Sequence, residues 1–428
     1  MSRLFRGIPV LGPVAFTAFR VSLAVMLGAL LLFTWEGDLP LDSHRDVPIA
    51  AVPWLRAMAA QPGVIEWLQR GVLAGLVLFA AGVRPRLSFL FVALGFNLWF
   101  CLLSLRGNIH FLGPLPLALL LLIPTPWHEG SGIGSRGAVA GRTPRVPPGY
   151  GPWVLCLAFA VAFAAAGYAK GAQWAMNGTV RYHFMADADV AWVSIGPWIA
   201  ARPALAVGLS AVVVIVEQFA VVTPFLTPGL RAVAGVPVAL MIAGFVVMHD
   251  ALWPAWWTLL LGFVPWHLIG RRHPGPRVVA ATVGAPLVVL VPLVVLPLQQ
   301  VAASVFEIEA GPYLSAYDMY STTFESPEAF EREDGRPRFR MRAVTADGDV
   351  DIGACVREDE QAFLEMEAAV SAGPGRELPH RAVSRSLECG RQAGGTRVRI
   401  EADQRFFDWQ RGATGWKFRD RIVGDWPL

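Results

Sequence analysis

Residues 152–174 read PWVLCLAFAVAFAAAGYAKGAQW, and this stretch decides the fold. Lys170 is its one charged side chain, and nearly every other residue is apolar or small. A run of roughly 20 apolar residues matches the thickness of the hydrocarbon core of a bilayer. The stretch is therefore predicted to cross a membrane as a helix, with Lys170 near the outer end of the span.

The whole chain shares this membrane-like composition. Its 428 residues are 54% hydrophobic and 16% charged, whereas an average soluble domain is about a quarter charged. This composition excludes a soluble monomer and a disordered chain. The net charge of +3 gives no reason to expect a nucleic acid as partner. Among 36 lysines and arginines, only Lys170 and Lys417 are lysine, so Lys170 is the one lysine of the apolar part.

Nine apolar stretches predict the spans of the membrane part. The fourth is short and contains Pro114 and Pro116, so it is either a tilted span or a partly re-entrant segment. We therefore predict an all-α polytopic membrane bundle of about eight or nine transmembrane helices over residues 1–303. The stretches lie at about 14–34, 64–82, 87–105, 109–124, 152–173, 204–226, 231–249, 251–269 and 278–303.

Arginines orient this bundle, because loops on the cytoplasmic side are enriched in basic residues. With the N-terminus in the cytoplasm, the inner loops contain the arginines of residues 84–86, 136–145 and 271–277. The outer loop near residues 36–63 is acidic. An odd number of spans then places the C-terminal part outside the cytoplasm.

Residues 304–428 have a different composition and predict a small α+β extracytoplasmic domain. Charged and apolar residues alternate over 338–342 and 397–400, which is the pattern of a strand. Residues 357–370 have the pattern of an amphipathic helix. Cys355 and Cys389 lie in this domain, where a disulfide would persist, but their spacing alone leaves open whether they pair.

Charged side chains inside spans are costly and therefore point to function. Arg20 and Glu217 are predicted to form an ion pair between the first and sixth spans, most simply as a structural clamp. Gly167, Lys170 and Trp174 share one helical face, on which glycine admits either another backbone or a ligand. Lys170 itself is either a snorkelling boundary residue or a desolvated amine that acts as a base, a role closed to arginine.

Two histidines, His110 and His249, fall at the same predicted outer boundary as Lys170. A lone boundary histidine is usually a solvated side chain, but three titratable groups at one depth favour a site. One lysine and two distant histidines without a carboxylate partner do not make a metal site. We therefore predict no metal.

These motifs, in this order, make the membrane part resemble the horizontally transferred transmembrane domain family, which includes vitamin K-dependent gamma-glutamyl carboxylases. Lys170 falls on the lysine that acts as base in the carboxylases. The matching stretches are AFRVSLAVMLG with Arg20, NIHFLGPLPLALLLLIP with Asn108 and His110, AGYAKGAQW with Lys170, MHDALWPAWWTLLLGFVPW with His249, and YLSAYDMYSTTF followed by ADGDVDI.

The resemblance implies a carboxylase-like enzyme in a bacterial cell membrane. Lys170 would deprotonate a reduced quinone, either vitamin K hydroquinone or menaquinol, with O2 and CO2 as co-substrates. The acceptor would be a glutamate side chain of an exported peptide or protein, carboxylated at its gamma carbon. The implied site residues are Lys170, His110 and His249 as catalytic groups and Trp174, Gly167 and Asn108 as cofactor-binding groups.

The sequence departs from the carboxylases beside this lysine and after the membrane part. The carboxylases carry another lysine before the base and an acidic residue after it, where this chain has Ala169 and the pair Ala172 and Gln173. Their large lumenal domain is mostly missing. The alternative is a non-catalytic membrane factor for maturation or export of a secreted peptide, as in the sporulation-delaying toxin maturation proteins, which resemble the same family. A transporter ranks last, because no inverted repeat is seen.

Overall fold

A computed structural model describes most of the chain, and its residues fall into two compact units. The first comprises 1–175, 211–247 and 251–322, and the second comprises 176–210, 248–250 and 323–428. The predicted domain boundary after residue 303 falls within the last turn of the helix that ends at Val305, and residues 306–325 lie outside the described set. The described residues are 8–9, 11–34, 53–61, 63–106, 112–127, 146–188, 191–193, 195–249, 252–269, 285–305, 326–327, 330, 338–346, 348–371, 377–408, 413–417 and 422–428.

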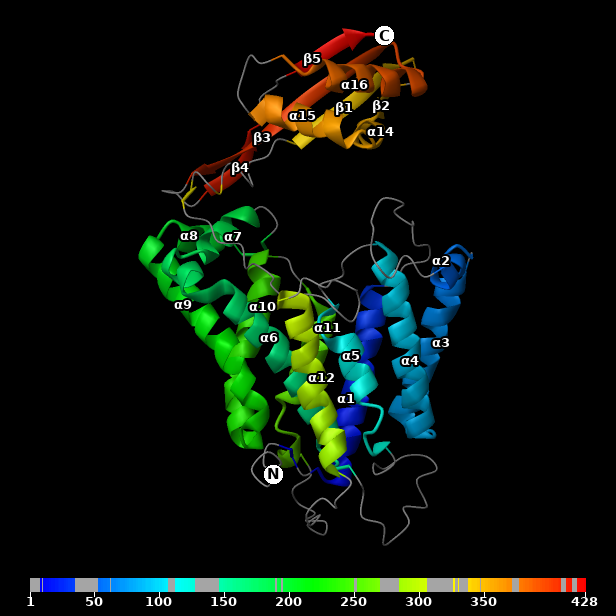
Figure 1. The fold of residues 1–428 in the computed structure, drawn as a ribbon, viewed down its shortest axis with the longest axis vertical. Coiled ribbons are helices and arrows are strands. Elements are labelled where there is room, and N and C mark those ends of the chain that lie inside the picture. The colour runs from blue at the N-terminus through cyan, green and yellow to red at the C-terminus, as the bar shows by residue number, and fades with distance from the viewer. Residues whose placement is uncertain are drawn as a thin grey trace. The chain divides into compact units, whose positions relative to one another are not determined.

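Among the described residues, six helices are long and apolar enough to cross a membrane (Figure 1). Four of them begin with a proline. Proline suits the first turn of a helix, because the N–H that it lacks would have no partner there. The predicted membrane character is confirmed, while the count of eight or nine spans stays a prediction. The six are α1 (Pro13–Phe33), α3 (Val64–Ala81), α4 (Pro85–Leu103), α6 (Tyr150–Met176), α9 (Pro203–Phe219) with the 3-10 turn Ala220–Phe225, and α10 (Pro228–His249).

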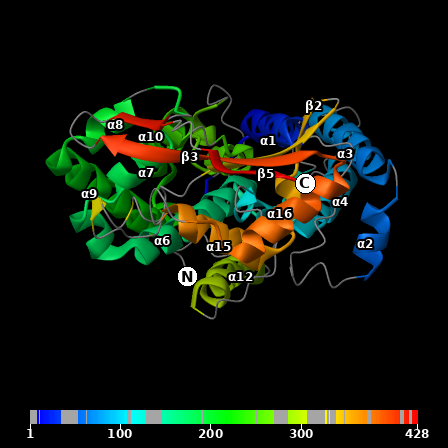
Figure 2. The same cartoon turned by 90° about the horizontal axis from the view of Figure 1, so that it is seen from above.

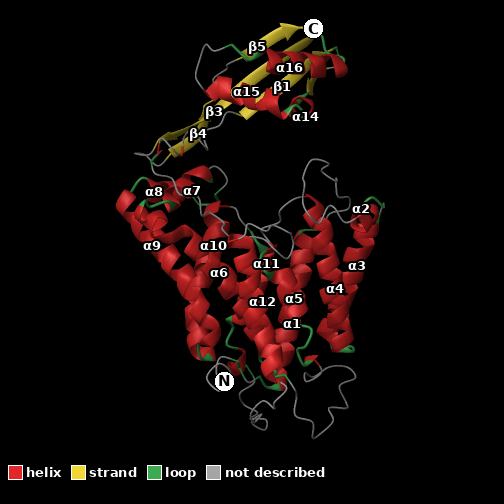
Figure 3. Ribbon diagram, viewed as in Figure 1, coloured by secondary structure: helices red, strands yellow, loops and turns green. Residues whose placement is uncertain are grey.

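Shorter helices complete the membrane part. The helix α12 (Ala285–Val305) has a shorter apolar core, Leu287–Ala302. Figure 3 shows how these helices alternate with turns along the chain. The remaining short helices are α2 (Pro53–Ala59), α5 (Leu115–Leu121), α7 (Val180–Ala186), α8 (Ile195–Ala200) and α11 (Pro254–Leu259).

The predicted span at 251–269 is wrong as a continuous helix. After α11 the chain forms two separate 3-10 turns, Leu260–Gly262 and Trp266–Leu268. Irregular backbone at membrane depth is tolerated where protein surrounds it. Here α6 packs against the turn so closely that a Cβ on Gly262 would overlap the backbone nitrogen of Cys156. Likewise, the predicted span at 109–124 contains only the short helix α5 among its described residues.

A tyrosine compensates for a proline inside α12. Pro292 lacks an N–H and therefore leaves the carbonyl of Val288 without its helical donor. The hydroxyl of Tyr150, at the start of α6, lies 3.3 Å from this carbonyl and 3.0 Å from that of Leu121. The single hydroxyl hydrogen is shared between the two carbonyls, of which that of Leu121 is closer, and so links α6 to both helices at polar backbone groups that lipid cannot satisfy.

The core of the membrane part is aromatic. Four phenylalanines surround Trp127, with ring centroids 4.5–6.0 Å from its own. They come from α1, α3 and α4, which therefore converge on one buried indole. The four are Phe16, Phe19, Phe79 and Phe89.

The C-terminal part contains both helices and strands, as predicted, and its strands form an antiparallel sheet. The strand order is β2-β1-β3-β4, and β5 also pairs with β3. The predicted strands and the predicted amphipathic helix are present, and Figure 2 shows α15 and α16 lying along the sheet. The elements are β1 (Arg338–Thr345), β2 (Gly348–Asp351), α14 (Gly353–Arg357), α15 (Glu360–Ser371), α16 (His380–Gln392), β3 (Arg397–Asp408), β4 (Ala413–Lys417) and β5 (Ile422–Pro427).

A disulfide between Cys355 and Cys389 joins α14 to α16. The bonded residues have Cα atoms 5.9 Å apart. They adjoin the apolar core that Met341, Val398 and Ile400 form on the sheet. The pairing that the spacing left open is therefore present, and it holds two helices over the sheet.

Replacing Cys355 and Cys389 together by serine is expected to destabilise the C-terminal part by about 3–4 kcal/mol, because the bond closes a loop between residues 34 positions apart. Hydrogen exchange of the full chain in detergent measures this change. Cys101→Ser, at a cysteine of α4 that is not part of the disulfide, is the control. Equal exchange in the C-terminal part of both variants would contradict the prediction.

Candidate functional site

Lys170 lies at a break in α6. The next residue, Gly171, has φ +63° and ψ −174°, values outside the helical region. A side chain is strained at this φ, so glycine suits the position. The break follows the lysine directly, and the lysine side chain is only 3% exposed. The snorkelling alternative is therefore wrong, because the ammonium lies inside the protein.

The partner of Lys170 is Glu217 of α9. The Nζ atom lies 2.9 Å from each carboxylate oxygen, and the side chain of Glu217 is also 3% exposed. The predicted ion pair between Arg20 and Glu217 is wrong. Arg20 instead donates from Nη2 to the carbonyl of Ala80 at 3.5 Å, between α1 and α3. The sequence shows which charges are buried, but the neighbouring helix decides which of them pair.

Gly167 brings α6 and α9 together one turn before the lysine. A Cβ there would lie 2.7 Å from the Cβ of Glu217 and 2.8 Å from the backbone nitrogen of Gln218. Gln218 in turn donates from Nε2 to the carbonyl of Gly167 at 3.1 Å. Of the two uses predicted for this glycine, close approach of another backbone is correct. The space is taken by α9, so Gly167 is not placed to bind a cofactor.

Trp174 completes the predicted face of α6. Its side chain is buried, and the Nζ of Lys170 lies 5.6 Å from the ring centroid. A cation at this distance is attracted by the electrons of the ring. The lysine thus has two oxygens and an aromatic ring around it. Removing either charge would leave the other buried and uncompensated, at a cost of about 3–5 kcal/mol.

His249, the last residue of α10, has a carboxylate partner that sequence reasoning missed. Its Nδ1 lies 2.6 Å from Oδ2 of Asp187, which directly follows α7. The imidazole is 4% exposed and stacks on Phe184 with centroids 5.3 Å apart. Asp187 lies in the predicted outer loop between the fifth and sixth spans. Because that loop contains many other polar residues, the sequence did not single out Asp187. Both partners belong to the second unit, whereas Lys170 and Glu217 belong to the first.

The structure does not place every predicted site residue. His110 and Asn108 lie outside the described residues. The part of the chain that the structure describes contains no group of three or more His, Cys, Asp or Glu side chains able to hold a metal ion. The described site residues therefore form two pairs, Lys170–Glu217 and Asp187–His249.

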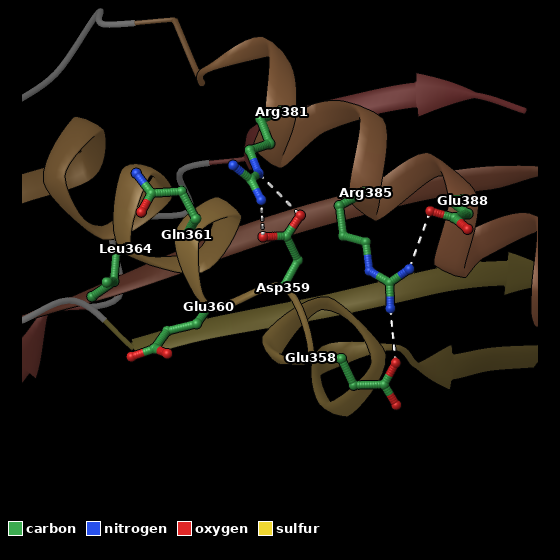
Figure 4. Close-up of a pocket in the computed structure, with 8 residues that line it drawn as sticks. All are labelled: Glu358, Asp359, Glu360, Gln361, Leu364, Arg381, Arg385 and Glu388. Atoms are coloured by element: carbon green, nitrogen blue, oxygen red, sulfur yellow. Dashed lines mark hydrogen bonds and ion pairs between the residues drawn. The ribbon is translucent and has the colours of Figure 1, made fainter. Parts of the chain in front are cut away.

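A charged cavity of about 840 Å³ lies beside α15 and α16 in the C-terminal part (Figure 4). Its arginines are already paired: Arg381 holds Asp359 at 2.9 Å, and Arg385 holds Glu358 at 2.8 Å and Glu388 at 3.1 Å. The hydrogen bond from Arg381, followed by that from the N–H of Ala362, lowers the pKa of Asp359. These pairs leave little positive charge for an anionic ligand, so the cavity is a weaker candidate than the membrane pairs.

No known protein family, curated protein or solved structure matches the chain. The two pairs are therefore interpreted from their own geometry. Each joins a titratable base to a carboxylate, and in each the basic side chain is almost wholly buried. Such an arrangement is suited to holding or moving a proton.

Gly167→Ala is expected to lower the thermal stability of the membrane part by about 1–3 kcal/mol, because the added methyl group would overlap α9. Thermal unfolding in detergent, followed by tryptophan fluorescence, measures the change. Gly208→Ala on α9 is the matched control, since a Cβ there meets no atom within 4 Å. Equal melting temperatures of the two variants would refute close packing at Gly167.

Asp359→Asn is expected to flatten the acid dependence of stability in the C-terminal part. The lowered pKa of Asp359 in the folded state means that its stabilisation is present above the ordinary value of 3.8 and is lost as the pH falls below it. Hydrogen exchange of the full chain between about pH 2 and 5 tests this. Glu360→Gln, in the same cavity, is the control, and an identical acid response in wild type and Asp359→Asn would refute the prediction.

Proposed function

We propose that the chain is an integral membrane, carboxylase-like enzyme that couples oxidation of a reduced quinone to gamma-carboxylation of glutamate in an exported peptide or protein. One observation carries the proposal. The buried pair of Lys170 and Glu217 lies beside the break in α6, on the lysine to which the family resemblance assigns the base. A lysine held inside the protein at a helix break is placed for chemistry rather than for contact with lipid headgroups.

The donor set around Lys170 suits a hydroquinone. Its amine and the carboxylate of Glu217 are groups that can hydrogen-bond a phenolic hydroxyl, and the buried ring of Trp174 beside them would be the aromatic contact of the ligand. When bound, the reduced quinone would supply, through oxidation by O2, the strong base that carboxylation needs. Lys170 and Trp174 would hold it, with vitamin K hydroquinone or menaquinol as candidates.

Glu217 explains how Lys170 becomes a base. As an ammonium the lysine has no lone pair, so it first has to give up a proton. Glu217, 2.9 Å away, is placed to take that proton. The transfer removes two opposite charges from a buried site, where isolated charges are costly. The neutral amine of Lys170 then accepts the proton of the ligand hydroxyl.

A second function is supported by the same pair. Two oxygens equally distant from one ammonium are also the geometry of a structural clamp. A clamp would suit a non-catalytic membrane factor for maturation or export of a secreted peptide. The two functions differ in whether the lysine has to lose a proton.

We place the protein in a bacterial cell membrane with its N-terminus in the cytoplasm and its C-terminal domain outside. The Cys355–Cys389 disulfide supports this orientation, because disulfides persist mainly in oxidising compartments. The apolar helices make the bilayer itself a partner. The proposal includes neither a metal nor a nucleic acid.

The test is mass spectrometry of glutamate-containing peptides incubated with the reconstituted protein, reduced quinone, O2 and bicarbonate. Wild type is expected to add one CO2 per modified glutamate. Lys170→Ala and Lys170→Arg are both expected to lower the rate by about 10²–10⁴-fold, the usual contribution of a general base.

Lys170→Arg separates the two functions, because arginine keeps the charge and the contact with Glu217 but stays protonated. Its melting temperature should remain near that of wild type, while Lys170→Ala should melt earlier. Full carboxylation by Lys170→Arg would refute the base role and favour the clamp. If wild type modifies no peptide under these conditions, the carboxylase proposal itself fails.

A further inference from the structure

The short helix α8 has two different faces. Ile195 and Trp198, three residues apart and therefore on one face of the helix, are 41% and 49% exposed. The other four residues of the helix are buried, and Ala200 shares a small apolar core with Tyr182 and Met185 of α7. One face of α8 is thus fixed on the protein, while the other presents apolar side chains to the surroundings.

This exposed apolar surface is dense for a segment that precedes the span α9. Trp192 and Val193, just before α8, are exposed as well. Among the described residues from 326 to 428, by contrast, the only large hydrophobic side chains that are exposed are those of Val350 and Leu364. A surface that faces water carries such side chains singly, whereas a cluster of them marks contact with an apolar partner.

The chain holds α8 beside a membrane span. The helix ends at Ala200 and α9 begins at Pro203, so only two residues connect them (Figure 1). Three peptide links of about 3.8 Å keep these two ends within about 11 Å of each other. The headgroup region on each face of a bilayer is about 5–8 Å thick. Because the exposed large apolar side chains of α9 begin at Leu205, its third residue, α8 is held near the level of the headgroups.

Arg202, in this connection, supplies a cation at the same level. Its Cζ lies 3.9 Å from the ring centroid of Trp198, and its Nη1 donates to the backbone carbonyl of that residue at 2.7 Å. The residue is exposed, so its remaining N–H groups can reach a phosphate oxygen. The same combination recurs in the first turn of α3, where Arg70 lies 5.4 Å from the ring centroid of Trp67. Tryptophan is enriched at the boundary between lipid and water.

From these observations we infer that α8 is an interfacial helix, which lies along the membrane surface with Ile195 and Trp198 among the lipid headgroups. Its partner is the phospholipid of one leaflet. The apolar side chains contact the upper part of the acyl chains, and Arg202 contacts the phosphates. Through its buried face, α8 ties α7 to the membrane surface. The inference does not depend on the proposed reaction, because it uses none of the residues assigned to that reaction.

Depth-dependent quenching of a fluorescent label in nanodiscs tests this inference. The label is attached to the full chain through Ile195→Cys or Trp198→Cys, each of which leaves the other side chain in place. Two exposed apolar positions serve as references: Leu364→Cys in the C-terminal part and Ile215→Cys within α9. All variants carry Cys101→Ser, and that background chain, treated in the same way, is the blank. The quenchers are iodide in the water, a lipid spin-labelled near its headgroup, and a lipid spin-labelled near its chain end.

Both labels on α8 are expected to be quenched most strongly by the lipid that carries its spin label near the headgroup. The label at 364 should respond to iodide, and the label at 215 to the spin label near the chain end. Quenching of the α8 labels by iodide alone would overturn the inference and show a surface that faces water. Quenching by none of the three would also overturn it, because protein would then cover α8. A preference for the chain-end label would place α8 inside the span.

The role of Arg202 is tested in the same assay. In Arg202→Leu, the label at 195 is expected to shift toward the chain-end quencher, because the cation that holds this boundary at the phosphates is gone. Arg357→Leu, which removes an arginine beside the ring of Phe363 in the C-terminal part, is the matched control. An unchanged depth in Arg202→Leu would overturn the contact between Arg202 and the phosphates.

Discussion

A charge buried in a membrane protein has to meet an opposite charge, and the arrangement of α6 and α9 depends on this constraint. Lys170 and Glu217 cannot reach water, so each is stable only beside the other. Their contact needs two helices at very short separation, which Gly167 allows because it has no side chain. Gln218, the neighbour of Glu217, then bonds to the carbonyl of Gly167. One ion pair thus explains the glycine, the amide and the packing of both helices.

The same requirement applies to the backbone. Where prolines or 3-10 turns interrupt a helix, protein groups replace the missing hydrogen bonds or cover the irregular chain. Tyr150 bonds to the carbonyl that Pro292 leaves free, and the turn at Gly262 packs against the backbone of Cys156. These devices let the chain depart from continuous spans without exposing polar groups to lipid. They also explain why an apolar stretch such as residues 251–269 does not form one continuous helix.

Most of the fold prediction came from two sequence patterns, the length of the apolar stretches and the alternation of charged with apolar residues. Six long helices and the strands at 338–345 and 397–408 follow from them, because burial in lipid or on one face of a sheet leaves a direct pattern in the sequence. The choice of partner for a buried charged side chain leaves no such pattern. Glu217 is as compatible with Arg20 as with Lys170 until α6 is placed beside α9, and Asp187 was missed for the same reason. The residues of a site were therefore easier to predict than their partners.

The choice of lysine in this pair is itself informative. A clamp that holds both oxygens of one carboxylate is better made by arginine, whose planar guanidinium matches that geometry with two parallel hydrogen bonds. This chain uses arginine almost everywhere, since only Lys170 and Lys417 are lysine among its 36 strongly basic residues. Yet the buried partner of Glu217 is a lysine. The property that lysine has and arginine lacks is the ability to lose a proton near neutral pH once it is desolvated. Geometry alone is compatible with a clamp, but geometry together with residue usage favours a group that exchanges a proton with Glu217.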